Sequence, residues 1–60
     1  MNATIDQIKK QNFIKCAQAI RPFVASNDEA IDHAIKMGQE SMDHYQIARA
    51  EKAARRALKS

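Results

Sequence analysis

The hydrophobic and polar positions of this 60-residue chain recur at helical spacing almost throughout. From Ile5 to Arg21, apolar side chains return every three or four residues, and a second such pattern runs from Asn27 to Leu58 without a proline. We therefore predict an all-α fold of one domain, residues 1–60, in which a short first helix and a long second helix form a helical hairpin. The predicted core comprises Ile8, Phe13, Cys16, Ile20, Phe23, Ile31, Ile35, Met42 and Tyr45.

Polar residues mark the ends of these helices. Thr4 followed by Gln7, and Ser26 followed by Glu29, each have the spacing of a capping box, which predicts helix starts near residues 5 and 27. Pro22 has no amide hydrogen and ends the first helix. The apolar pair that follows it, residues 23–24, predicts a short helical turn that covers one end of the core.

The apolar stripe of the second helix changes face near Gln46. At about 100° per residue, the stripe before this position points one way and the residues after it point nearly the opposite way. A shorter first helix cannot cover that second edge, so we expect a second copy of the chain to cover it and the protein to be a homodimer. The predicted self-association edge comprises Ile47, Ala50, Ala54 and Leu58.

Gly38 is the one position where the long helix could break. A glycine within a helix costs about 1 kcal/mol relative to alanine. The stripe stays in phase across Gly38, which favours a continuous helix, and a small residue there permits close helix approach. The alternative is that the helix ends at Met37 and that Ser41 caps a third helix.

The positive charge belongs to the C-terminal part of the chain. The net charge is +3, but residues 1–46 have five basic and six acidic residues, whereas residues 47–60 have five basic and one acidic. This C-terminal segment is a basic amphipathic helical extension whose cations share one face, suited to a partner protein or to phosphates. The candidate contact residues are Arg49, Lys52, Arg55, Arg56 and Lys59.

Residues 33–47 offer a second route to nucleic acid, because their spacing resembles a helix-turn-helix. The motif's alanine, hydrophobic, turn, cap and core positions would be Ala34, Met37, Gly38, Ser41 and Ile47. Polar residues depart from the pattern where the motif has apolar ones. If the motif formed, Met42, Asp43, Gln46 and Arg49 would lie near DNA.

The sequence gives little support for a metal site or a catalytic site. The acid and histidine pairs at helical spacing, residues 29 with 33 and 40 with 44, lack further converging ligands and are interpreted as ion pairs. Cys16 is single and suits a small core residue. We expect no enzymatic activity, metal, cofactor or small-molecule substrate.

The apolar runs are too short to cross a bilayer, and the N-terminal residues lack the apolar region of a secretory signal. We therefore expect a cytoplasmic protein that does not bind membranes. The sequence favours a small interaction or regulatory protein that dimerises and engages a protein partner through its C-terminal helix. The alternative is a DNA-binding regulator that uses the basic stripe or the region from Ala34 to Ile47. In general type, such a chain is typical of small bacterial or phage regulators.

Overall fold

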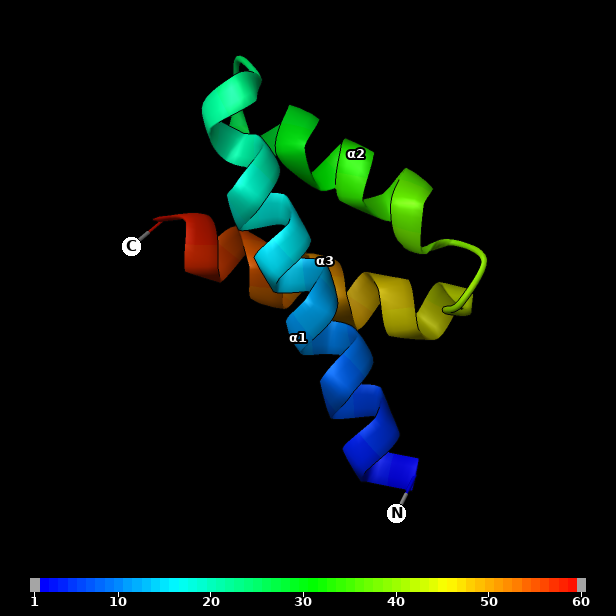
Figure 1. Cartoon of the computed structure of the whole chain (residues 1–60). Coiled ribbons are helices and arrows are strands. Elements are labelled where there is room, and N and C mark those ends of the chain that lie inside the picture. Colours follow the sequence, from blue (N-terminus) through cyan, green and yellow to red (C-terminus); the bar gives the residue numbers. More distant parts are fainter. Residues whose placement is uncertain (1, 60) are drawn as a thin grey trace.

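Three helices cross one another around a small core (Figure 1). The computed structural model describes the backbone of residues 2–59 and the side chains of residues 5–59. Within this part of the chain, the elements are α1 (Asn2–Ile20), a 3-10 turn η1 (Arg21–Phe23), α2 (Asn27–Gly38) and α3 (His44–Lys59). The radius of gyration is 10.8 Å, close to the roughly 10.4 Å expected for a compact chain of this length. The predicted all-α class is confirmed.

The turn between α1 and α2 forms where the sequence predicts it. Pro22 lies in the first turn of η1, and the side chain of Arg21 holds the loop together. Its Nε donates to Asn27 Oδ1 over 2.5 Å, and its Nη1 donates to the carbonyl oxygen of Val24 over 3.1 Å. The prediction that Phe23 covers the core is wrong, because this side chain is 86% exposed.

The start of α2 is confirmed at Asn27. Ser26 has extended backbone angles, and its Oγ accepts a hydrogen bond from the amide of Glu29 over 3.2 Å. Asp28 and Glu29 place negative charge in the first turn, where the helix dipole is positive. The start of α1 differs from the prediction, since the helix already includes Asn2 rather than beginning near Ile5.

The predicted continuous second helix is wrong, and the alternative with a third helix is confirmed. Helix α2 ends at Gly38, residues 39–43 form a turn, and α3 begins at His44. The cap is Asp43 rather than Ser41: Asp43 Oδ1 accepts from the amide of Gln46 over 2.8 Å, and Gln46 Oε1 accepts from the amide of Asp43 over 3.1 Å. This reciprocal capping box starts a new helix and explains the break.

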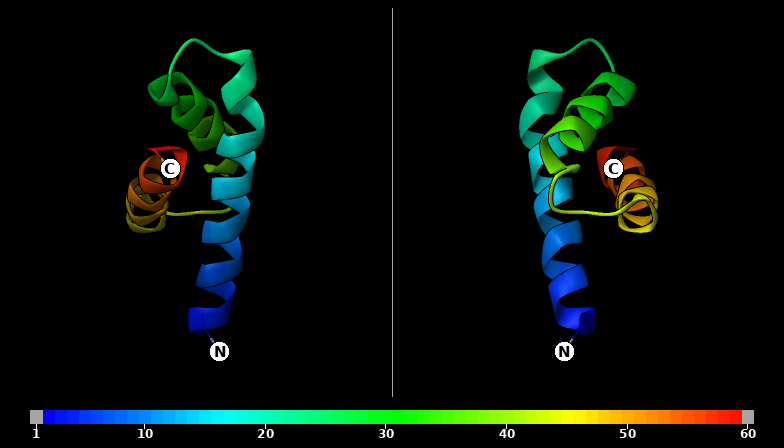
Figure 2. Two further views of the ribbon diagram at one scale, coloured as in Figure 1. Left: turned by 90° about the vertical axis from the view of Figure 1, so that its left-hand side faces the viewer. Right: turned by 90° about the vertical axis from the view of Figure 1, so that its right-hand side faces the viewer.

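Helix α3 turns back and packs against both α1 and α2, with its most extensive contact on α1. Figure 2 shows α3 crossing beside α1 rather than extending away from a hairpin. Its apolar edge is therefore covered within the same chain: Ala50 and Ala54 are 0% exposed, and Ile47 and Leu58 pack against the core. The premise that only a second copy could cover this edge is wrong.

The core is built from few large side chains and several alanines. Phe13, Ile31 and Met42 supply most of its volume, and burial of each contributes on the order of 1.5–3 kcal/mol. Alanines 17, 30, 34, 50 and 54 are nearly or fully buried, which lets the helix backbones approach closely. Cys16, Ile20 and Ile35 are half-buried. The predicted core positions Ile8 and Tyr45 are wrong, since these side chains are 55% and 70% exposed.

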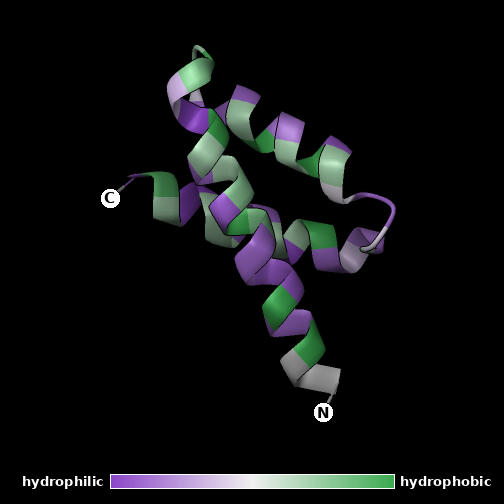
Figure 3. Ribbon diagram, in the orientation of Figure 1, coloured by the Kyte–Doolittle hydropathy of each residue, from purple (hydrophilic) through white to green (hydrophobic). Residues whose placement is uncertain are grey.

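The N-terminal turns of α1 extend past α3, so the overhang lies at the opposite end of the chain from the predicted one (Figure 1). Apolar bands occur on this projecting part (Figure 3). Ile5 and Ile8, near the start of α1, are each 55% exposed. None of the helices in residues 2–59 has the length and apolar character required to cross a membrane.

Candidate functional site

The outward face of α3 gathers cations and one aromatic ring. At about 100° per residue, five exposed side chains fall within an arc of roughly 80°, opposite the buried alanines of the same helix. Because the inner face is occupied by the core, this basic face is turned to solvent along the length of α3. We define the basic face as Tyr45, Arg49, Lys52, Arg56 and Lys59.

Arg55, the fifth predicted contact residue, lies about 40° outside that arc, toward α2. Its Nη1 forms an ion pair with Asp28 at the start of α2, and its Nη2 lies 3.5 Å from Glu51 Oε1. The hydrogen bond with Asp28 raises the pKa of Arg55, and partial desolvation opposes this shift. Arg55 therefore joins α3 to α2, whereas the other predicted cations face outward.

Tyr45 is the functional candidate that sequence reasoning assigned to the core. It lies at the N-terminal end of the basic face, one turn before Arg49, whose guanidinium carbon is 5.7 Å from the centre of the tyrosine ring. This cation–π contact leaves the tyrosine side chain 70% exposed. The four-residue spacing of Tyr45 and Arg49 is visible in the sequence. It indicates an exposed pair only when α3 is known to be a helix separate from α2.

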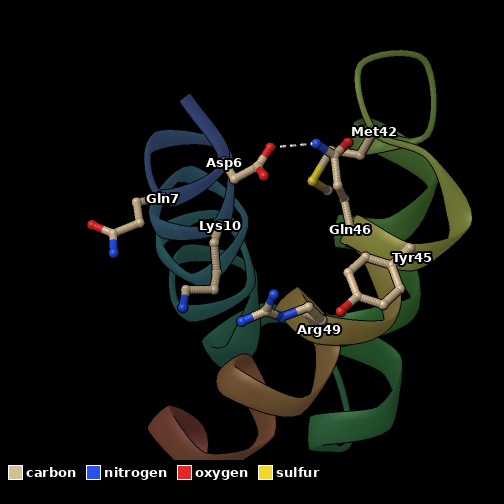
Figure 4. A pocket seen from close by; sticks show the side chains of 7 residues that line it. All are labelled: Asp6, Gln7, Lys10, Met42, Tyr45, Gln46 and Arg49. Atoms are coloured by element: carbon tan, nitrogen blue, oxygen red, sulfur yellow. Dashed lines mark hydrogen bonds between the residues drawn. The ribbon is translucent and has the colours of Figure 1, made fainter. Parts of the chain in front are cut away.

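A hollow of about 170 Å³ lies where the N-terminal part of α1 passes the start of α3 (Figure 4). Tyr45 and Arg49 line it from α3, and Lys10 lines it from α1. In Figure 4, Lys10 and Arg49 reach toward the same end of the hollow. The remaining lining residues are Asp6, Gln7, Met42 and Gln46.

Gln46 fixes the other end of this hollow. Its Nε2 donates to Asp6 Oδ1 over 2.6 Å, while its Oε1 and amide complete the cap with Asp43. The carboxylate of Asp6 is thus held against α3, away from the end toward which Lys10 and Arg49 point (Figure 4). The hollow has a cationic end and an acidic end, both positioned by the crossing of α1 and α3.

The structure agrees with the helix-turn-helix hypothesis at some positions and disagrees with it at others. Two helices do flank a turn, and Ala34 is buried as the motif requires. Two of the four side chains predicted to lie near DNA do not face outward, since Met42 is 8% exposed and Gln46 is bonded to Asp6 and Asp43. Arg49 alone of that set belongs to the basic face.

The histidine and acid pairs gain no further ligands. Glu40 lies in the turn, so it no longer shares a helix with His44. Among the residues whose positions are described, no three His, Cys, Asp or Glu side chains are grouped so that they could hold a metal ion. Ion pairs within helices do form between Asp32 and Lys36 and between Glu51 and Arg55, each over 3.5 Å.

A second hollow, of about 200 Å³, lies between α1 and the C-terminal end of α2. Cys16 lines it and donates to Met37 Sδ over 3.5 Å. The surrounding residues Phe13, Ala34 and Met42 belong to the core, so this hollow is a gap in packing at the surface and presents no cationic side chain other than Lys9.

Comparisons of the chain with protein-family models, with curated proteins and with solved structures gave no match. The chemistry of the basic face and of the hollow beside it therefore supplies the functional argument.

Proposed function

We propose that this protein binds nucleic acid through the basic face of α3 and does so without catalysing a reaction. The observation that carries the proposal is the place of Tyr45: an exposed ring lies on the same face as the cations and next to Arg49. Cations that follow one helix face can contact successive phosphates, and aromatic side chains among them can stack on bases.

The distribution of acidic groups supports the proposal. Asp28 and Glu51 lie with Arg55 on the flank of α3 that meets α2, so they do not interrupt the outward face. On the other flank, Lys10 from α1 adds a cation beside Arg49. A phosphate chain running along α3 would therefore meet positive charge from α1 across to the C-terminal turn.

The size of the hollow favours contact with part of a larger ligand over the enclosure of a small-molecule substrate. Its volume of about 170 Å³ is below the roughly 300 Å³ at which ordinary ligand pockets begin. A hollow of this size can hold one planar group with a phosphate at its edge, but it cannot enclose a whole nucleotide. The absence of enzymatic activity remains a prediction.

Salt dependence tests the proposal directly. With about four phosphate contacts, the logarithm of the affinity should fall with the logarithm of salt concentration with a slope of about −3 to −3.6. Fluorescence anisotropy of a labelled strand should then show a loss of about 60- to 150-fold between 50 and 200 mM salt. No detectable binding to single strands or duplexes at low salt would exclude the proposal.

A matched pair of charge variants separates the basic face from net charge. Lys52→Gln removes a cation from the centre of the face and should reduce the slope by about 0.7–0.9. Lys15→Gln removes the same charge from an exposed position on α1 that points away from α3. It should leave the slope nearly unchanged, and equal effects of the two variants would argue against a defined interface.

Homodimer formation is a second candidate property, and exposed apolar residues of α1 rather than of α3 favour it. Ile5 and Ile8 lie one turn apart near the start of α1 and are each 55% exposed. The accessible surface of 4504 Å² also exceeds the roughly 4000 Å² typical of a 6.8 kDa monomer. Light scattering should show a mass that rises with concentration and returns to the monomer value in Ile8→Glu. A constant monomer mass would exclude this candidate.

A further inference from the structure

The hollow between α1 and α3 combines three features that a single nucleotide can use at once. It has an exposed aromatic ring, a cationic end and an acidic end, and all are positioned by the backbone crossing rather than by a loop (Figure 4). Surface charges that only interact with water do not require such an arrangement.

Tyr45 supplies a platform for a base. Its ring has Arg49 at 5.7 Å from its centre and keeps 70% of the side chain exposed, so a planar group can reach it. Stacking on an aromatic ring works for every base because each has a π-face, and a neighbouring guanidinium adds a second planar surface.

Lys10 and Arg49 supply a place for the phosphate of the same nucleotide. They come from different helices and reach the same end of the hollow (Figure 4), next to the ring. Asp6 is held at the opposite end by its hydrogen bond from Gln46, and its carboxylate repels a phosphate there. This polarity fixes which end of the hollow receives the phosphate.

An unpaired base satisfies these constraints and a base within a duplex does not. In a duplex both faces of each base are covered by its neighbours, so stacking on Tyr45 would require the duplex to be opened. In a single strand the base can turn onto the ring while its phosphate remains between the two cations.

We propose that the hollow beside Tyr45 binds one unpaired nucleotide, so that the protein prefers single-stranded nucleic acid to duplex. This proposal rests on the proposed function, since the remaining phosphates of the strand lie along the basic face. The base stacks on Tyr45, and the adjacent phosphate lies between Lys10 and Arg49.

A comparison of three ligands of equal length tests the proposal: an oligothymidylate strand, an abasic strand with the same phosphates, and a duplex. Anisotropy at low salt should show the oligothymidylate binding about 5- to 150-fold more tightly than the abasic strand, the range expected from one stacked base. The duplex should also bind more weakly than the oligothymidylate.

Tyr45 is the only tyrosine, and the chain has no tryptophan, so intrinsic fluorescence reports on this one ring. Oligothymidylate should quench it and the abasic strand should not. Tyr45→Phe keeps the stacking surface and should bind the oligothymidylate normally, whereas Tyr45→Ala should bind it as weakly as the abasic strand. Circular dichroism of both variants checks that they remain helical, as expected for an exposed position.

The outcomes distinguish the two proposals. If base-bearing and abasic strands bind equally well, or if Tyr45→Ala has no effect, the basic face binds phosphates but the nucleotide site is wrong. Duplex binding as tight as single-strand binding would also overturn the preference. Failure of all three ligands to bind at low salt would overturn both proposals.

Discussion

Gln46 donates a hydrogen bond from Nε2 to Asp6 Oδ1 over 2.6 Å, and this bond joins the first turn of α3 to α1. The same side chain accepts from the amide of Asp43 and so belongs to the cap of α3. One glutamine therefore both starts the third helix and positions it against the first. Asp6 and Gln46 line the same hollow as Lys10 and Arg49.

Removing the cap should destabilise the protein measurably. Asp43→Ala loses the oxygen that accepts from the Gln46 amide, and N-cap losses of this kind cost about 0.5–2 kcal/mol. Urea unfolding followed by circular dichroism gives the free energy of unfolding. Ser41→Ala is the control and should cost less, because Ser41 only donates to the carbonyl of Gly38 in the turn. A larger loss for Ser41→Ala would contradict the cap assignment.

Gly38→Ala should stabilise the protein by up to about 1 kcal/mol, since alanine is the better helix former at this last residue of α2. The new Cβ would lie 3.1 Å from Met42 Cε, the far end of a flexible side chain, and 3.8 Å from Phe13 Cδ2. Met42 need only shift slightly. For a domain of this size, the expected rise in Tm is about 4–8 °C per kcal/mol.

A bulkier change at the same position provides the contrast. Gly38→Val adds atoms that a small shift of Met42 cannot accommodate and should lower Tm. If Gly38→Ala lowers Tm as well, the Met42 methyl group is held more firmly than its flexibility suggests.

Enlarging a buried alanine of α3 tests whether these alanines pack within one chain or in an interface between chains. Ala54 is 0% exposed, so Ala54→Leu should cost about 1–3 kcal/mol of unfolding free energy through overpacking. Ala48→Leu, at an exposed position of the same helix, should change stability by no more than about 0.5 kcal/mol. Equal stabilities of the two variants, with a change in mass only for Ala54→Leu, would place Ala54 in an interface between chains instead.

Releasing Arg55 from its ion pair with Asp28 should strengthen binding to single strands. Asp28→Asn removes the carboxylate that holds Arg55 beside α2, so this cation becomes able to contact a phosphate. The salt slope should become steeper by up to about 0.7. Asp32→Asn removes the same charge from α2 at a site paired with Lys36, and it should leave the slope unchanged. Identical gains in both variants would mean that only net charge matters.

Much of the secondary structure could be predicted from local chemistry. Ser26 and Glu29 fix the start of α2, and Pro22 fixes the turn before it, because capping and the missing amide act within a few residues. The break at Gly38 was also within reach of the sequence. Asp43 and Gln46 have capping-box spacing, but the prediction followed the apolar stripe and considered only Ser41 as the cap of a third helix.

The sequence by itself determined the helical class, the cap at Ser26 and the concentration of positive charge in the last fourteen residues. Only the tertiary structure decided what each face of the third helix meets. Once the chain turns at residues 39–43, Ala50 and Ala54 become part of the core, while Tyr45 leaves the predicted core and joins the cations. Periodicity records that a helix has two faces, but which face is buried depends on where the neighbouring helix lies, and that depends on the turn.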